Sequence, residues 1–210
     1  MIADLKDFLT ERLLKALPGD NAHQQMMAKP IGQRFKMKYS EPPKKGAVMI
    51  ALYPFDNKVY FPLMKRPPYQ GVHGGQVSLP GGKKEDSDQT LIETAIRETY
   101  EEIGVKISDQ QVIGSLSDLN VTASNFIVKP VISILNEKPE FSRDPREVEH
   151  IFQAELEHLI HPQTIQEKEL TVAKEVRLKA PFFDIDEKVV WGATAMILSE
   201  FVEILKEHYK

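Results

Sequence analysis

The chain has 210 residues, of which 41% are hydrophobic and 28% charged, a composition that predicts one globular domain with a substantial core and argues against disorder. The net charge of -4 makes a general nucleic-acid-binding surface unexpected, and the lack of cysteine excludes disulfides, thiolate metal sites and a cysteine nucleophile. No apolar run approaches the roughly 20 residues of a membrane-spanning helix. The sequence therefore predicts a cytoplasmic protein that binds neither nucleic acid nor membrane.

Residues 1–45 are expected to form a helix and a connector outside the main domain. Apolar residues recur at helical spacing from Ile2 until a Pro-Gly pair ends the pattern at Gly19. Residues 20–45 are polar and contain several prolines, which favours a connector that wraps onto the domain. The main domain is then expected to span 46–210.

Strand-like and helical patterns alternate along the main domain. Two β-like runs at 47–53 and 58–66 flank Asp56-Asn57, which predicts a hairpin, with Pro62 at an edge or bulge. Further strands are expected at 111–118, 126–135 and 168–178, and helices at 90–103, near 153–160 and from about 192 onwards. A sheet flanked by helices, an α/β fold, is the expected architecture.

The helix expected at 90–103 carries an unusual concentration of carboxylates. Glu98, Glu101 and Glu102 lie three and four residues apart, so they share one face of the helix. Each like-charge pair at this spacing destabilises an isolated helix by roughly 0.2–0.5 kcal/mol, which an exposed acidic face tolerates. A bound divalent cation would turn this repulsion into attraction. The Gly81-Gly82 pair upstream lets backbone approach a metal or phosphate closely.

The stretch PGGKKEDSDQTLIETAIRETYEEIGV at 80–105 resembles the Nudix box, G-x5-E-x7-R-E-U-x-E-E-x-G-U, in which U is a bulky aliphatic residue. After the glycine pair, the residues in register are Arg97, Glu98, Glu101, Glu102, Gly104 and Val105. Two positions differ: fourteen residues rather than thirteen separate Gly82 from Arg97, and Thr99 replaces the first aliphatic residue, while Asp88 takes the place of the early glutamate. These differences resemble the coenzyme A diphosphatase branch of that superfamily.

The stretch LMKRPPYQGVHGGQVSLPGG at 63–82 is similar, with departures, to the upstream signature of that branch, L-L-T-x-R-[SA]-x3-R-x3-G-x3-F-P-G-G. The residues in register are Leu63, Arg66, Gly75, Pro80, Gly81 and Gly82. Gly71 stands where the branch has an arginine able to contact a phosphate. Segments 144–152 and 189–198 also look like this branch, so the resemblance covers about residues 45–205.

The resemblance implies a Nudix-like α/β/α sandwich with a mixed β-sheet and an N-terminal helical extension. It implies Mg²⁺- or Mn²⁺-dependent hydrolysis of a small nucleoside-linked diphosphate. Coenzyme A or acyl-coenzyme A is favoured, giving phosphopantetheine or its acyl form and adenosine 3′,5′-bisphosphate. Two alternatives stay open: a Nudix hydrolase of ADP-ribose, dinucleotides or nucleoside triphosphates, and a non-catalytic ligand-binding module. The oligomeric state is left open, with a homodimer compatible.

The resemblance also implies roles for the residues of the box. Glu98 and Glu102 would be the main metal ligands, Glu101 would share in coordination or orientation, and the Gly82 carbonyl could add a ligand. Glu101, Glu102 and Arg97 would be the catalytic residues of the helix. Arg97 lies four residues before Glu101, a spacing that lets its guanidinium hold that carboxylate in place.

Outside the helix, Arg66, Gly81 and Gly82 are the expected substrate-binding residues. Glu147 is the candidate for a general base or an extra metal ligand, and a solvated surface position explains it equally well. Its rivals in the same loop are Asp144 and Glu149.

Two further residues have two readings each. His73 could contact substrate or polarise a metal-bound water, but a histidine in such a loop is more often structural or solvent-facing, so no role is assigned to it. Trp191 could stack on adenine, although packing into the core is the favoured reading because an apolar helix follows it.

Overall fold

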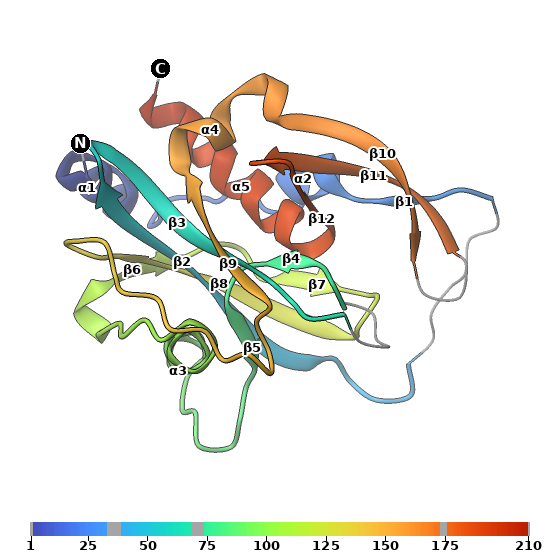
Figure 1. Cartoon of the computed structure of the whole chain (residues 1–210), viewed down its shortest axis with the longest axis horizontal. Coiled ribbons are helices and arrows are strands. Elements are labelled where there is room, and N and C mark those ends of the chain that lie inside the picture. The colour runs from blue at the N-terminus through green and yellow to red at the C-terminus, as the bar shows by residue number, and fades with distance from the viewer. Residues whose placement is uncertain (1, 33–38, 69–73, 173–175, 210) are drawn as a thin grey trace.

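The computed structural model describes residues 2–32, 39–68, 74–172 and 176–209, which fold into two β-sheets and surrounding helices (Figure 1). The helices are α1 (Ile2–Arg12), α2 (Asp20–His23), α3 (Leu91–Ile103), α4 (Leu156–Ile160) and α5 (Gly192–His208), with short 3₁₀ helices at Gln24–Met26, Asp109–Gln111 and Pro162–Thr164. No described helix combines the length and the hydropathy needed to cross a membrane.

The larger sheet has eight strands and is mixed. Its strands are β2 (Lys44–Phe55), β3 (Lys58–Lys65), β4 (Val77–Ser78), β5 (Gly81–Lys83), β6 (Val112–Ser115), β7 (Leu119–Val121), β8 (Phe126–Ile134) and β9 (His150–Glu155). The main path runs β4-β3-β2-β8-β6, and β2 and β8 are parallel neighbours, whereas β5 pairs antiparallel with β2. The second sheet contains β1 (Lys29–Pro30), β10 (Ile165–Val172), β11 (Val176–Ile185) and β12 (Lys188–Trp191).

The predicted hairpin between the first two long strands is confirmed. Asp56 and Asn57 connect β2 to β3 with φ values of 47° and 57°, the left-handed conformations that tight hairpin turns require. The pairing of β3 with β2 ends at Tyr60, opposite Tyr53. Pro62 lies beyond this point and pairs with Gln153 of β9. A proline is tolerated there because the strand no longer needs a hydrogen-bond donor for β2.

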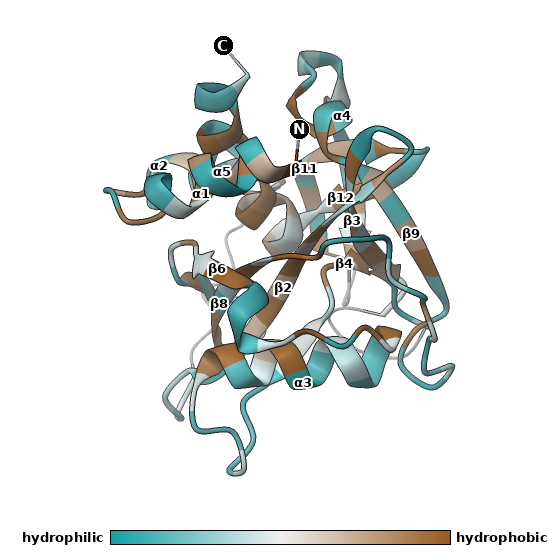
Figure 2. Ribbon diagram, turned by 90° about the vertical axis from the view of Figure 1, so that its left-hand side faces the viewer, coloured by the Kyte–Doolittle hydropathy of each residue, from teal (hydrophilic) through white to brown (hydrophobic). Residues whose placement is uncertain are grey.

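Helices cover both faces of the larger sheet, as the α/β/α expectation requires (Figures 1 and 2). Alternate residues of β2 belong to two separate hydrophobic clusters, because successive side chains of a strand point to opposite faces. Met49 and Ala51 share a cluster with α3, whereas Ile50 and Leu52 share the other with α1 and α5. The mixed sheet between helical layers is therefore confirmed.

The N-terminal segment contributes to the main core. Leu5, Leu9 and Met26 are buried in the cluster that contains α5, and Lys29 of β1 pairs with Lys179 of β11. The helix was expected to continue towards residue 17 but ends at Arg12. Leu13 and Leu17, the last apolar residues of the periodic pattern, lie beyond the helix and pack partly buried against this core.

Three boundaries differ from the sequence prediction. The run 168–178 is not one strand: β10 and β11 lie antiparallel on either side of 173–175. Alternation continues through both strands, and the run contains no Gly, Pro, Asn or Asp to indicate a turn. The helix expected near 153–160 is shorter because β9 pairs with β3 as far as Glu155, and the strand expected at 111–118 shortens to β6 after a 3₁₀ turn.

Candidate active site

Local signals at both ends fix the position of α3. The Thr90 hydroxyl accepts a hydrogen bond from the Glu93 amide at 3.1 Å, and the Glu93 carboxylate accepts one from the Gln89 amide at 2.7 Å. These contacts satisfy donors that a helix start leaves unpaired. At the other end Gly104 adopts a left-handed φ of 75° and donates to the Tyr100 carbonyl. The carboxylates between these ends are therefore held on a well-defined helix.

The glycine pair of β5 brings backbone against that helix. Gly81 has a φ of 147°, and a Cβ there would lie 2.2 Å from the Ala47 carbonyl oxygen. A Cβ on Gly82 would lie 2.5 Å from the carboxylate of Glu98. Gly81 needs glycine because its clash is with fixed backbone, whereas a side chain on Gly82 would have to displace the Glu98 carboxylate from its present position. The Glu98 carboxylate consequently lies directly beside the Gly82 backbone.

Glu102 is a nearly buried carboxylate, with 2% of its side chain exposed. It accepts a hydrogen bond from the Gly81 amide at 2.7 Å and lies 3.3 Å from Nη2 of Arg66. Burial raises the pKa of Glu102 to about 8, even though Arg66 and the Gly81 amide lower it; repulsion from Glu98 and Glu147 adds to the rise. The site therefore disfavours the charged form of Glu102 unless more positive charge is supplied.

Glu98 is in a similar situation. Burial raises the pKa of Glu98, while Arg97 opposes the rise and the charges of Glu101 and Glu147 reinforce it. The buried Glu102 and the partly buried Glu98 thus repel each other with too little positive charge around them.

Arg97 connects the helix to the loop before it. Its guanidinium donates to both oxygens of Asp88 at 2.9 Å, to Glu98 at 3.0 Å, to Glu101 at 2.8 Å and to the Lys83 carbonyl at 3.1 Å. Hydrogen bonding with Arg97 holds the pKa of Asp88 well below its usual range. The sequence prediction treated Asp88 only as the occupant of a motif position, and no pattern in the sequence indicated that it anchors Arg97.

Glu101 differs from its two neighbours. Its side chain is 54% exposed and is turned towards Arg97. Within the described residues, no three His, Cys, Asp or Glu side chains gather closely enough to form a metal site as they stand. The fit for a divalent cation rests on two carboxylates with raised pKa values: the partly buried Glu98 beside the Gly82 backbone and the buried Glu102 at the Gly81 amide.

The loop that contains Glu147 is tied to the end of α3. The Asp144 amide donates to the Glu102 carbonyl at 3.0 Å, and the Glu147 amide donates to the Asp144 carbonyl at 3.1 Å. The Glu147 charge raises the pKa of both Glu98 and Glu102, so Glu147 lies within electrostatic reach of the cluster. Its two rivals are engaged elsewhere: the Asp144 carboxylate pairs with Arg146 at 2.6 Å, and that of Glu149 with Lys65 at 2.9 Å.

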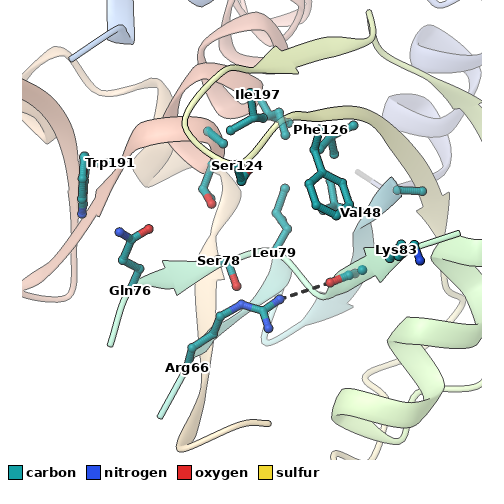
Figure 3. A pocket seen from close by; sticks show the side chains of 17 residues that line it. Val48, Arg66, Gln76, Ser78, Leu79, Lys83, Ser124, Phe126, Trp191 and Ile197 are labelled. Atoms are coloured by element: carbon teal, nitrogen blue, oxygen red, sulfur yellow. Dashed lines mark hydrogen bonds between the residues drawn. The ribbon is translucent and has the colours of Figure 1, made fainter. Parts of the chain in front are cut away.

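Figure 3 shows a cavity of about 270 Å³ whose lining includes Gly81, Gly82 and Arg66, the residues that contact Glu98 and Glu102. Arg66 stands at its edge, where it donates to the Gly81 carbonyl at 3.2 Å. Apolar side chains make up much of the wall: Val48, Leu79, Val121, Phe126, Val128 and Ile197. The cavity is therefore suited to a substituent with a large apolar surface.

Trp191 lies at the same cavity, which corrects one sequence prediction. The residue is half-buried, lines the cavity and belongs to neither hydrophobic cluster. Core packing was the favoured reading because α5 follows directly, but Trp191 ends β12 opposite Phe182 and stays outside the apolar stripe of the helix. Gly71 and His73 lie outside the described residues.

Comparison with known proteins places these features in a family. Residues 43–192 match the family described as NUDIX domain. The chain is 36% identical over 172 residues to "Nudix hydrolase 15, mitochondrial" of Arabidopsis thaliana, covering 79% of this chain and 60% of that protein's length. It is 26% identical over 177 residues to "Uncharacterized Nudix hydrolase NudL" of Photorhabdus laumondii, covering 81% of this chain and 93% of the relative.

A solved structure supports the fold independently. The MutT/nudix family protein from Enterococcus faecalis superposes with a TM-score of 0.55 at 15% identity, covering 97% of this chain and 74% of that one. At this identity the likeness concerns the fold alone. Since the family match spans most of the sequence, the chain belongs to the Nudix family.

Proposed function

We propose that the protein hydrolyses a nucleoside-linked diphosphate with the help of a divalent cation. One observation carries this proposal above the others: the partly buried Glu98 lies beside the Gly82 backbone, the buried Glu102 is bonded to the adjacent Gly81 amide, and desolvation raises the pKa of both. An arrangement that destabilises its own charges is suited to a site that gains a cation. The proximity of Arg66 and an apolar cavity suits a substrate with a phosphate and a nucleoside.

Nudix hydrolases generally use divalent metal ions, and Mg²⁺ or Mn²⁺ is our proposal for this chain. Glu98 and Glu102 would hold the ion, with Glu101 and the Gly82 carbonyl as further ligands. When bound, the ion would neutralise diphosphate charge and make a bound water more acidic.

The other residues act on the substrate and on one another. Arg66 binds a phosphate oxygen, since its guanidinium already lies at the edge of the cavity. Arg97 keeps the carboxylates of Glu98 and Glu101 in place through the bonds described above. Glu147 takes a proton from the attacking water, because it is the loop carboxylate within reach of the cluster.

For the substrate we propose coenzyme A or an acyl derivative, which would be cleaved to phosphopantetheine, or its acyl form, and adenosine 3′,5′-bisphosphate. The upstream signature around Arg66 and Gly75 supports this choice. Gly71 stands where an arginine is expected, so ADP-ribose, dinucleotides and nucleoside triphosphates are the second candidates. A binding module without turnover is disfavoured because Glu98, Glu101 and Glu102 are all present.

The test is a turnover screen with Mg²⁺ and with Mn²⁺. Coenzyme A, acetyl-coenzyme A, ADP-ribose, NADH and nucleoside triphosphates would be offered in parallel and the products identified by mass. We expect cleavage within the diphosphate of coenzyme A. Preferred cleavage of ADP-ribose would overturn the proposed substrate but not the proposed reaction. No turnover of any compound would favour the alternative of a ligand-binding module without catalysis.

A further inference from the structure

A second hollow adjoins the cavity of the candidate active site. It is a groove of about 810 Å³ between strands β3, β4 and β9 of the larger sheet and strands β10 and β12 of the smaller one. Gln76 and Trp191 line both the groove and the cavity. Figure 3 shows these two side chains together at one side of the cavity, away from Phe126 and Val48. The two hollows therefore meet at the only tryptophan of the chain.

The groove and the cavity lie on either side of the end of β3. Lys65 lines the groove, and the next residue, Arg66, lines the cavity. Glu149, two residues after Glu147, also lines the groove. A diphosphate held at Arg66 would consequently have one hollow available for each of its two substituents.

The chemistry of the groove differs from that of a phosphate site. Three lysines and three carboxylates line it, so the charges balance: Lys65, Lys168, Lys188, Glu149, Asp186 and Glu187. Lys65 is paired with Glu149 at 2.9 Å, and Lys188 donates to the Asp186 carbonyl at 2.6 Å. Because the opposite charges along the groove are equal in number, it favours an occupant without net charge.

Apolar surface continues along the groove between these polar groups. The rings of His150 and Phe152 lie 4.8 Å apart, and Lys188 covers the Phe152 ring at 5.2 Å. Leu170 and Val189 add aliphatic surface from β10 and β12. An extended chain that alternates aliphatic carbons with amide or hydroxyl groups would match this mixture, since both kinds of surface would be covered.

We propose that this groove binds the second arm of the substrate, a neutral and flexible chain bearing amides, while the cavity binds the nucleoside. The inference rests on the proposed diphosphate hydrolysis and deepens it, because it assigns each arm to its own hollow. Trp191 separates the arms and contacts both.

Trp191 also provides the measurement. As the single tryptophan, it reports binding in either hollow through its fluorescence, without turnover. Pantetheine is the probe for the arm and AMP the probe for the nucleoside, each titrated alone and then in the presence of the other. We expect each probe to change the emission of Trp191, and saturating AMP to leave the Kd of pantetheine within about twofold.

A matched pair of variants on β10 locates the arm. Leu170 lines the groove, whereas the next residue, Thr171, is exposed and does not line it. Leu170→Phe, which fills the groove, should weaken pantetheine binding by about tenfold and leave AMP binding unchanged. Thr171→Phe should change neither.

Three results would overturn the inference: no pantetheine binding by the wild type, competition between pantetheine and AMP, or an equal effect of Leu170→Phe on both probes. A failure of the proposed reaction is recognised separately, as a lack of turnover in the substrate screen.

Discussion

Glu102 and Glu200 are both buried glutamates, but the protein treats their charges in opposite ways. Glu200 on α5 has 0% exposure and accepts hydrogen bonds from the Gly19 amide at 2.9 Å, the Ser117 hydroxyl at 2.6 Å and the Ser117 amide at 3.2 Å. His23 Nε2 lies 3.1 Å from Oε2 of Glu200, the oxygen that also accepts from the Ser117 amide. Burial raises the pKa of Glu200, yet the bonds from His23, Ser117 and Gly19 outweigh it, and the net pKa is lowered.

Glu102 has a shorter set of partners and two repelling neighbours. One oxygen of Glu102 accepts from the Gly81 amide and the other faces Arg66, while the charges of Glu98 and Glu147 repel it. The charge of Glu200 is therefore compensated by hydrogen bonds within the protein. Those from Gly19 and His23 connect the N-terminal segment to α5. The charge of Glu102 is not fully compensated by its partners, as expected of a carboxylate whose further partner is a metal ion.

The largest effect is expected for turnover when Glu102 is changed. Glu102→Gln should lower kcat/KM for the preferred diphosphate by roughly 10²- to 10³-fold, because the metal would lose an anionic ligand. The metal-free variant should remain folded, since a neutral side chain suits the buried position better. Steady-state kinetics with Mg²⁺ would measure the loss of kcat/KM, and a thermal unfolding curve would show whether the metal-free variant is folded. A rate near that of the wild type would remove Glu102 from the site.

The opposite pattern is expected for Glu200. Glu200→Gln should lower the free energy of unfolding by about 3 kcal/mol, because it breaks a buried network and leaves His23 without its anionic partner. Activity per folded molecule should remain, since Glu200 contacts no proposed site residue. Urea unfolding and active-site-normalised rates measure both. If the variant kept full stability, the network would not hold the N-terminal segment.

A smaller effect, on metal affinity, is expected when Arg97 is replaced by lysine. Arg97→Lys should weaken Mn²⁺ binding by about 10- to 100-fold, since a lysine cannot hold Asp88, Glu98 and Glu101 at once. Arg146→Lys is the matched control, because Arg146 bonds a carboxylate on the exposed loop. Calorimetric titration would give both affinities. Equal losses in the two variants would contradict a positioning role for Arg97.

The smallest effect is a pH dependence of opposite sign at the two glutamates. The pKa of Glu102 is raised from 4.5 to about 8, so its contribution to stability is present below its unfolded pKa and lost as the pH rises towards 8. The pKa of Glu200 is lowered, so its contribution is present above its unfolded pKa and lost on acidification. Without metal, the Tm of Glu102→Gln should exceed that of the wild type by an amount that grows as the pH rises from 4.5 to about 8 and then levels off. Parallel Tm curves from acid to alkaline pH would refute the assignment.

The sequence predicted what depends on local pattern. The helix α3 with its clustered carboxylates and the β2–β3 hairpin follow from periodicity and turn residues, which are encoded within a few positions. The α/β class followed from the alternating strand and helix patterns, and the more specific α/β/α sandwich from the resemblance around residues 80–105. These features need no knowledge of distant contacts.

The features that escaped depend on pairing between distant segments. The Asp88–Arg97 pair was missed because it needs the loop to return to the helix, and the role of Glu200 needs Gly19, His23 and Ser117 to meet. The boundary between β10 and β11 escaped because strand alternation passes through it unchanged. Trp191 was misjudged because the sheet sets its direction more strongly than the helix that follows it.

Cation binding by the two kinds of glutamate tests the central claim most directly. Mn²⁺ affinity would be measured by calorimetry at neutral pH for the wild type, Glu98→Gln, Glu102→Gln and Glu200→Gln, without substrate. We expect the first two variants to bind Mn²⁺ at least about tenfold more weakly than the wild type, and Glu200→Gln to bind it equally well. Equal Mn²⁺ affinity in the wild type and in Glu102→Gln would contradict the account.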